Sequence, residues 1–106
     1  MSEHKISHKE SDGRGTFYIA SQGSTEQHQA ALMYHYWGDD KSKVNVDHTE
    51  VNESLRGQDV GLSMLRELAD WARKQNLGVS ATCPFAVTMF KRYKEEFADV
   101  QVAYTA

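Results

Sequence analysis

Residues 47–62 read Asp47-His48-Thr49-Glu50-Val51-Asn52-Glu53-Ser54-Leu55-Arg56-Gly57-Gln58-Asp59-Val60-Gly61-Leu62. This order predicts a strand that runs into a glycine-punctuated turn and then into the start of a helix. Two glycines and an arginine just before a helix offer free backbone N–H groups and positive charge to one phosphate-bearing ligand. The stretch therefore predicts an anion site, and the carboxylate of Asp59 lies inside it.

Three predicted strands occupy the first half of the chain. Aromatic and β-branched residues indicate a strand at residues 15–20, a longer one follows at 27–37, and a third covers 44–51. The composition of residues 38–41 is typical of a hairpin turn between the second and third strands. We expect these three strands to pair antiparallel, with both sides of the second strand partly buried.

The apolar period changes to about 3.6 residues after the anion site. Val60, Met64, Leu68 and Trp71 form one stripe, which predicts an amphipathic helix of about four turns ending near residues 75–78. A short strand at 79–82 follows this crossover helix, so it should lie parallel to the strand that ends at Val51. A second helix should begin with Pro84 in its first position, and residues 100–104 are a candidate last strand.

These elements predict an α+β fold, which a broader classification would call α/β. We expect a mostly antiparallel mixed sheet flanked by two main helices. The 106 residues suffice for one core, so we expect a single domain over residues 1–106 with a polar leader at 1–13.

Composition excludes several classes of function. The net charge is −3 and the isoelectric point is near 5.9, which disfavours nucleic acid or an anionic membrane as a partner. Long apolar runs and a secretory signal are missing, and the single cysteine, Cys83, fits a reducing compartment, so we expect a cytoplasmic protein. The five histidines lack the spacings of zinc sites, and we predict no metal.

The predicted anion site is neither a P-loop, which needs a lysine and a Ser/Thr after its second glycine, nor a Rossmann turn. It resembles the pyrophosphate loop of the GCN5-related N-acetyltransferases, with Arg56 and Gly61 in the outer positions of the motif. Residues 47–51, 55–58 and 82–85 together resemble a small, single-domain branch of that family. The resemblance implies acetyl-CoA as co-substrate, bound by the loop and the preceding strand end: Val51, Arg56, Gly57, Gln58, Asp59, Val60 and Gly61.

Asp59 is the departure from this motif that bears directly on the chemistry, because a glycine is expected there. The position requires a backbone conformation that glycine reaches freely and that aspartate tolerates better than most residues. Its carboxylate would either repel a phosphate, which weakens binding, or point outward or cap the helix, where negative charge is favourable.

Three residues are candidate catalytic groups. The resemblance places Cys83 beside the bound thioester as a possible acetyl acceptor, and a thiol at a helix N-terminus is expected to have a lowered pKa. The alternative is a buried cysteine that acts as a small hydrophobic residue. Glu50 and His48 lie on one face of the third strand, where one of them could serve as the general base, or where they could simply satisfy one another.

Two functions follow from these residues. The first is an N-acetyltransferase that moves an acetyl group from acetyl-CoA to an unidentified amine, whether a small amine, a peptide or a protein. The second is a non-catalytic binding or interaction module with the same fold, in which Asp59 has weakened coenzyme affinity. A monomer or a weak homodimer fits either function.

Overall fold

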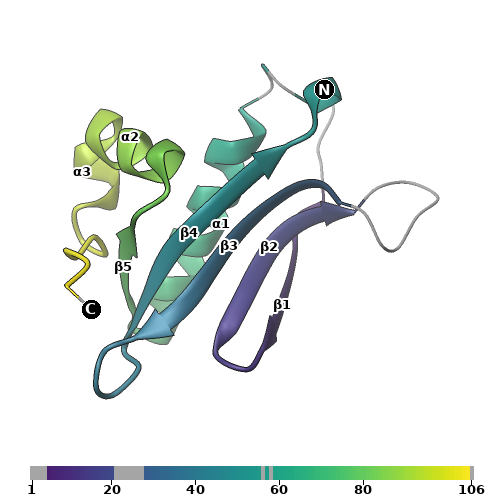
Figure 1. Cartoon of the computed structure of the whole chain (residues 1–106). Coiled ribbons are helices and arrows are strands. Elements are labelled where there is room, and N and C mark those ends of the chain that lie inside the picture. The colour runs from purple at the N-terminus through teal and green to yellow at the C-terminus, as the bar shows by residue number, and fades with distance from the viewer. Residues whose placement is uncertain (1–4, 21–27, 56, 58, 106) are drawn as a thin grey trace.

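The computed structural model describes residues 5–20, 28–55, 57 and 59–105. In these residues a single sheet has the strand order β1-β2-β3-β4-β5, which is also the order along the chain (Figure 1). The strands are β1 (Ser7–Ser11), β2 (Arg14–Ala20), β3 (His28–Trp37), β4 (Lys43–Val51) and β5 (Gly78–Ala81). The first four strands pair antiparallel and β5 pairs parallel with β4, so the predicted mixed sheet is confirmed.

The sequence analysis assigned no strand to the polar leader, but β1 forms there and pairs with β2. Polar side chains attach it to the rest of the protein. The His8 ring stacks on Phe17 at 4.0 Å between centroids, and the hydroxyls of Tyr34 and Tyr36 each donate to Glu10 Oε2 at 2.5 Å. Burial, followed by these bonds to the carboxylate, raises the pKa of both phenols, that of Tyr36 to about 12. Apolar periodicity misses a strand attached in this way.

The crossover helix α1 (Val60–Gln75) covers one face of the sheet and lies behind it in Figure 1. Its predicted start, stripe and end are confirmed, and Asn76 ends it in a left-handed conformation. We call the opposite side of the sheet the outer face. The core between α1 and the sheet includes Phe17, Leu32, Val44, Val46, Met64, Leu65 and Leu68.

Two short helices lie beside β5 (Figure 1), α2 (Pro84–Arg92) and α3 (Lys94–Phe97). Pro84 begins α2 as predicted. The predicted last strand at residues 100–104 is wrong, because the chain after α3 forms only a single parallel bridge between Gln101 and Val79. That bridge has two backbone hydrogen bonds of 2.8 Å, from the Val79 amide to the Val100 carbonyl and from the Val102 amide to the Val79 carbonyl. The Val100 and Gln101 amides both donate to the Phe97 carbonyl, which keeps the start of this segment in a turn.

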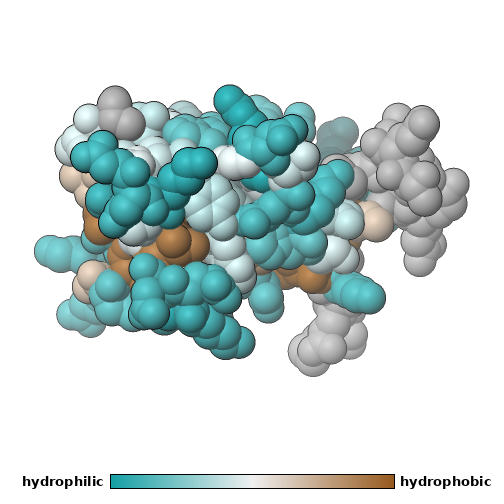
Figure 2. Space-filling model, turned by 90° about the horizontal axis from the view of Figure 1, so that it is seen from below, coloured by the Kyte–Doolittle hydropathy of each residue, from teal (hydrophilic) through white to brown (hydrophobic). Residues whose placement is uncertain are grey.

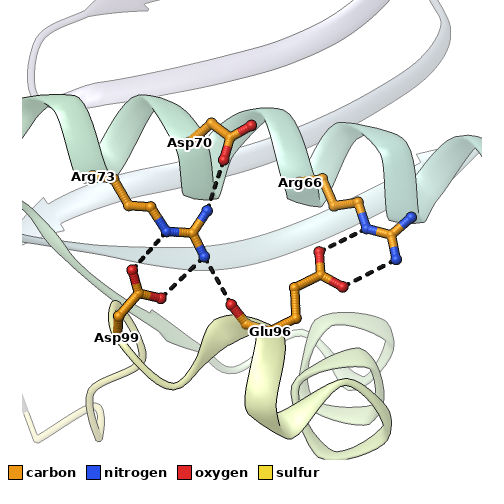
Figure 3. Close-up of polar contacts among 5 residues, drawn as sticks. All are labelled: Arg66, Asp70, Arg73, Glu96 and Asp99. Atoms are coloured by element: carbon orange, nitrogen blue, oxygen red, sulfur yellow. Dashed lines mark hydrogen bonds and ion pairs between the residues drawn. The ribbon is translucent and has the colours of Figure 1, made fainter.

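Two arginines of α1 hold α3 and the segment after it against the long helix (Figure 3). Arg66 makes a bidentate contact with Glu96, at 2.7 and 3.0 Å, and Arg73 makes one with Asp99, at 2.8 and 3.0 Å. Arg73 also donates to the Glu96 carbonyl at 2.8 Å and to Asp70 at 2.7 Å. These bonds lower the pKa of Glu96 and of Asp99.

Figure 2 views the molecule from below and shows a mostly hydrophilic surface, with hydrophobic atoms visible in patches between polar side chains. Among the described residues, no helix combines the length and apolar character needed to span a bilayer.

Candidate functional site

The candidate site lies where β4 and β5 separate. Their pairing ends at Val46 and Ala81, and the amides of Thr82 and Cys83 then both donate to the Val46 carbonyl at 3.1 Å. Within the described part of the chain, β4 continues to Val51 with β3 on one edge and no strand on the other. A strand edge of this kind offers backbone N–H and C=O groups to an extended ligand.

A bulge in β4 marks the same place. Tyr34 of β3 lies opposite Val46, whereas the next residue back, Met33, lies opposite His48, so Asp47 is the extra residue. A bulge increases the local twist and redirects the side chains around it. It lies at the point where β4 turns away from β5.

The loop after β4 connects this strand to helix α1. It contains the short 3₁₀ helix η1 (Glu53–Leu55), then Gly57 at φ 85° and Asp59 at φ 55°. Any residue with a side chain would be strained in the backbone conformation of Gly57. The predicted left-handed conformation of Asp59 is confirmed. The capping alternative is wrong, because the Asp59 side chain makes no cap hydrogen bond and its carbonyl accepts from the Ser63 amide at 3.0 Å.

Helix α1 begins immediately after this left-handed residue. The first amides of any α-helix have no acceptor within the helix, and here they belong to Val60, Gly61 and Leu62. They form the positive end of the helix dipole. The predicted ligands Arg56 and Gln58 lie outside the described residues.

A cleft of about 260 Å³ joins the strand edge, the loop, the start of α1 and helix α2. A Cβ atom at Gly61 would come within 2.7 Å of the Phe85 ring, so glycine allows α2 to pack closely against α1 there. Five of the seven predicted coenzyme-binding residues line the cleft: Val51, Gly57, Asp59, Val60 and Gly61. Its other lining residues are Leu55, Leu62, Phe85, Met89, Arg92 and Tyr93.

Three of these lining residues, Phe85, Met89 and Tyr93, were not among the predicted coenzyme-binding residues. Their spacing of four residues was the available signal, since it puts them on one helix face. Of the cations near the end of α2, Arg92 lines the cleft, whereas the adjacent Lys91 does not. One positive side chain therefore lies in the same cleft as the Asp59 carboxylate.

The three candidate catalytic residues lie on different sides of the sheet. Cys83 is 5% exposed, its thiol donates to the Thr49 hydroxyl at 3.3 Å, and it is not among the described residues that line the cleft. His48 and Glu50 lie on the outer face, 3.6 Å apart, with side chains 58% and 64% exposed. Their predicted common face is confirmed, but Glu50 lacks the burial that would favour a base. Among the described residues, no three His, Cys, Asp or Glu side chains gather as a metal site requires.

Comparisons with known proteins agree with this geometry. The family model described as GCN5-related N-acetyl-transferase matches residues 16–100. Protein NATD1 of Danio rerio is 33% identical over 70 residues, which are 66% of this chain and 60% of that protein. The solution structure of a GCN5-like candidate N-acetyltransferase from Staphylococcus aureus superposes with a TM-score of 0.67 and 30% identity, covering 99% of this chain and 94% of that one.

A crystal structure of ribosomal-protein-alanine N-acetyltransferase from Brucella melitensis superposes with a TM-score of 0.59 at 13% identity. The alignment covers 91% of this chain and 67% of that one, and it shows a shared fold.

Proposed function

This chain belongs to the GCN5-related N-acetyltransferase family, and from that premise we propose that it transfers an acetyl group from acetyl-CoA to an amine. One observation carries the proposal: the cleft combines an unpaired strand edge, a left-handed loop and a helix N-terminus. An extended pantetheine arm suits the strand edge, and a diphosphate suits the amides at the helix start.

Each part of the coenzyme has a counterpart in this proposal. The pantetheine arm pairs with β4 near Val51, and the pyrophosphate meets the amides from Gln58 to Gly61, with Arg56 as a cation. Arg92 adds a second cation from α2, and this offsets part of the repulsion from Asp59.

The reaction joins the acceptor nitrogen to the acetyl carbon. The nitrogen attacks the thioester carbonyl, the C–N bond forms, the C–S bond breaks, and coenzyme A leaves as its thiol after a proton moves from the nitrogen to the sulfur. Glu50 or His48 is a proposed proton acceptor for direct attack. Transfer through Cys83 is the other route, in which an acetylated thiol forms first and then passes the acetyl group to the amine. The cell compartment that we propose is the cytoplasm. It is reducing, so Cys83 stays a free thiol there, and it contains acceptors with free amines.

Calorimetric titration with acetyl-CoA tests the binding half of the proposal. Binding should weaken about tenfold in Arg92→Gln, as expected for loss of one charge pair near a phosphate, and should stay unchanged in Lys91→Gln. These two residues are adjacent and both exposed, so the second variant controls for the loss of one positive charge anywhere on this surface. If the wild-type protein gives no heat and no saturation, the coenzyme site is rejected and the non-catalytic interaction module is favoured.

Release of the coenzyme A thiol, followed with spermidine and with an unblocked peptide as acceptors, tests the catalytic half. Intact mass after incubation with acetyl-CoA alone tests the Cys83 route, which predicts a single added acetyl group that Cys83→Ser abolishes. A Cys83→Ser variant that turns over at the full rate excludes that route and leaves direct attack.

A further inference from the structure

Two polar side chains, Asn45 and Ser80, are buried within the described part of the sheet, each 1% exposed. Burying a polar group costs stability unless every donor and acceptor has a partner. In so small a domain an apolar pair would be the simpler way to fill the space. The positions of these two residues, side by side on β4 and β5, therefore call for an explanation.

Both residues belong to one chain of hydrogen bonds. The Trp37 indole donates to Ser80 Oγ at 3.0 Å, and Ser80 Oγ donates to Asn45 Oδ1 at 2.8 Å. The Asn45 amide then donates to Asp47 Oδ1 and to Thr82 Oγ1, each at 2.9 Å. Every donor and acceptor of the Asn45 side chain is used, and the chain ends at the Asp47 carboxylate.

Asp47 in turn orients a histidine. His35 Nδ1 lies 2.7 Å from Asp47 Oδ1 and 2.9 Å from Oδ2, so Nδ1–H is the donor and the lone pair is on Nε2. The Tyr104 hydroxyl lies 3.3 Å from Nε2 and supplies the O–H that this nitrogen accepts. A carboxylate that fixes Nδ1–H makes the Nε2 lone pair the proton-accepting site, which is the arrangement of a general base once an acceptor amine takes the place of the Tyr104 hydroxyl at Nε2.

The location of this pair connects it to the proposed reaction. Asp47 is the bulge residue of β4 and directly follows Val46, the last residue of β4 that pairs with β5. The pair therefore lies at the point where the two strands separate, on the outer face. In the proposed function the pantetheine arm runs along β4 toward this gap between the strands, and an acceptor would reach the thioester from the outer face.

We infer that His35 is the catalytic base of the acetyl transfer and that Asp47 is its positioning residue, an inference that rests on the function proposed above. As the acceptor nitrogen attacks the acetyl carbon, its proton passes to His35 Nε2, and the imidazolium that forms is stabilised by Asp47. The imidazolium then returns the proton to the departing sulfur, so the histidine ends the cycle neutral.

The exposed fractions of the side chains distinguish the pair of His35 and Asp47 from the alternative pair on β4. The side chains of His35 and Asp47 are 25% and 29% exposed and joined at 2.7 Å, whereas those of His48 and Glu50 are 58% and 64% exposed and 3.6 Å apart. A partly desolvated, closely bonded pair holds one tautomer and one orientation more firmly than a solvated one. The titratable groups that face His35 are Asp47, the Tyr104 hydroxyl and Arg14, its register partner on β2.

The test uses His35→Asn, whose amide nitrogen can still donate to Asp47 but which lacks Nε2. With acetyl-CoA and spermidine, kcat should fall about 10²- to 10⁴-fold while the acetyl-CoA Kd stays within twofold of wild type, as expected for loss of a general base. The acid limb of the pH–rate profile should disappear with it. Asp47→Asn should lower kcat less, and ¹⁵N NMR of its His35 ring should show loss of the single Nδ1–H tautomer. His35→Gln is the second variant if His35→Asn does not fold.

The outcomes are distinguishable. Wild-type protein that releases no thiol with any amine overturns the proposed function, and this inference with it. Wild-type turnover that persists in His35→Asn and His35→Gln, or that is lost in His48→Gln instead, overturns the inference alone. A wild-type His35 ring that is protonated at Nε2 rather than Nδ1 overturns it as well.

Discussion

Replacing Asp59 by asparagine removes one negative charge from the coenzyme cleft and changes little else. Asparagine tolerates the left-handed conformation of this residue, at φ 55°, as well as aspartate does. The side chain makes no cap hydrogen bond, so none is lost. Any change in coenzyme affinity therefore reports the charge itself.

The size of the effect follows from exposure. A carboxylate about 5 Å from a phosphate charge costs about 3 kcal/mol at an effective dielectric of 20 and about 1 kcal/mol in water. Asp59 is exposed, which favours the lower figure. We therefore expect Asp59→Asn to bind acetyl-CoA about five- to tenfold more tightly. The free protein should lose less than about 1 kcal/mol of stability, because a negative charge at a helix N-terminus is favourable.

Isothermal titration of both proteins with acetyl-CoA measures this gain, and S-acetylpantetheine, which has no phosphate, is the matched ligand control. The gain should vanish with the control ligand and shrink with salt, since the Debye length falls from about 30 Å at 0.01 M to about 3 Å at 1 M. Equal effects on the two ligands, or no effect on either, would refute a phosphate next to Asp59.

Three further predictions concern stability. Gly15→Ala places a Cβ 2.2 Å from the buried Tyr34 ring, so the free energy of unfolding measured in urea should fall by about 1 to 3 kcal/mol. A wild-type free energy of unfolding would contradict that packing. Asn76→Ala should cost about 1 kcal/mol in the same assay, because alanine is strained at the φ of 59° that ends α1, whereas Asn76→Gly should not. The carboxylates of Glu96 and Asp99 have lowered pKa values in the folded state, so their stabilisation is present above about pH 4 and is lost as the pH falls through those values. Thermal melts from pH 6 to 2 should show this loss, and high salt should reduce it.

Periodicity predicted most of the fold because the apolar residues repeat cleanly. The stripe from Val60 to Trp71 and the proline at position 84 located both main helices. It failed for β1, since Glu10 and His8 attach that strand through tyrosine hydroxyls and ring stacking, which leave no apolar alternation to detect. It also failed after Val100, where the pairing with β5 is limited to one bridge between Gln101 and Val79 and does not extend into a strand.

The candidate site was predictable where it depends on the local backbone. Gly57 and the left-handed Asp59 follow from residue type at a strand-to-helix turn. The pair of His35 and Asp47 was not predictable, because a register between β3 and β4 with an extra residue at the bulge brings the two together. No spacing along the chain indicates where a bulge falls.

The strand order that equals the chain order also has a consequence for how the protein folds. Each of the four antiparallel strands pairs with its neighbour in sequence, so the strands β1 to β4 can pair one after another by closing short loops. A nascent chain can therefore begin to pair these strands while it emerges from the ribosome. The apolar side of that meander, with Phe17, Leu32 and Val46, stays uncovered until α1 is made and docks. Pulsed hydrogen exchange should protect β2 and β3 before β5. Docking of α1 is then the event that ends the period of greatest risk of aggregation.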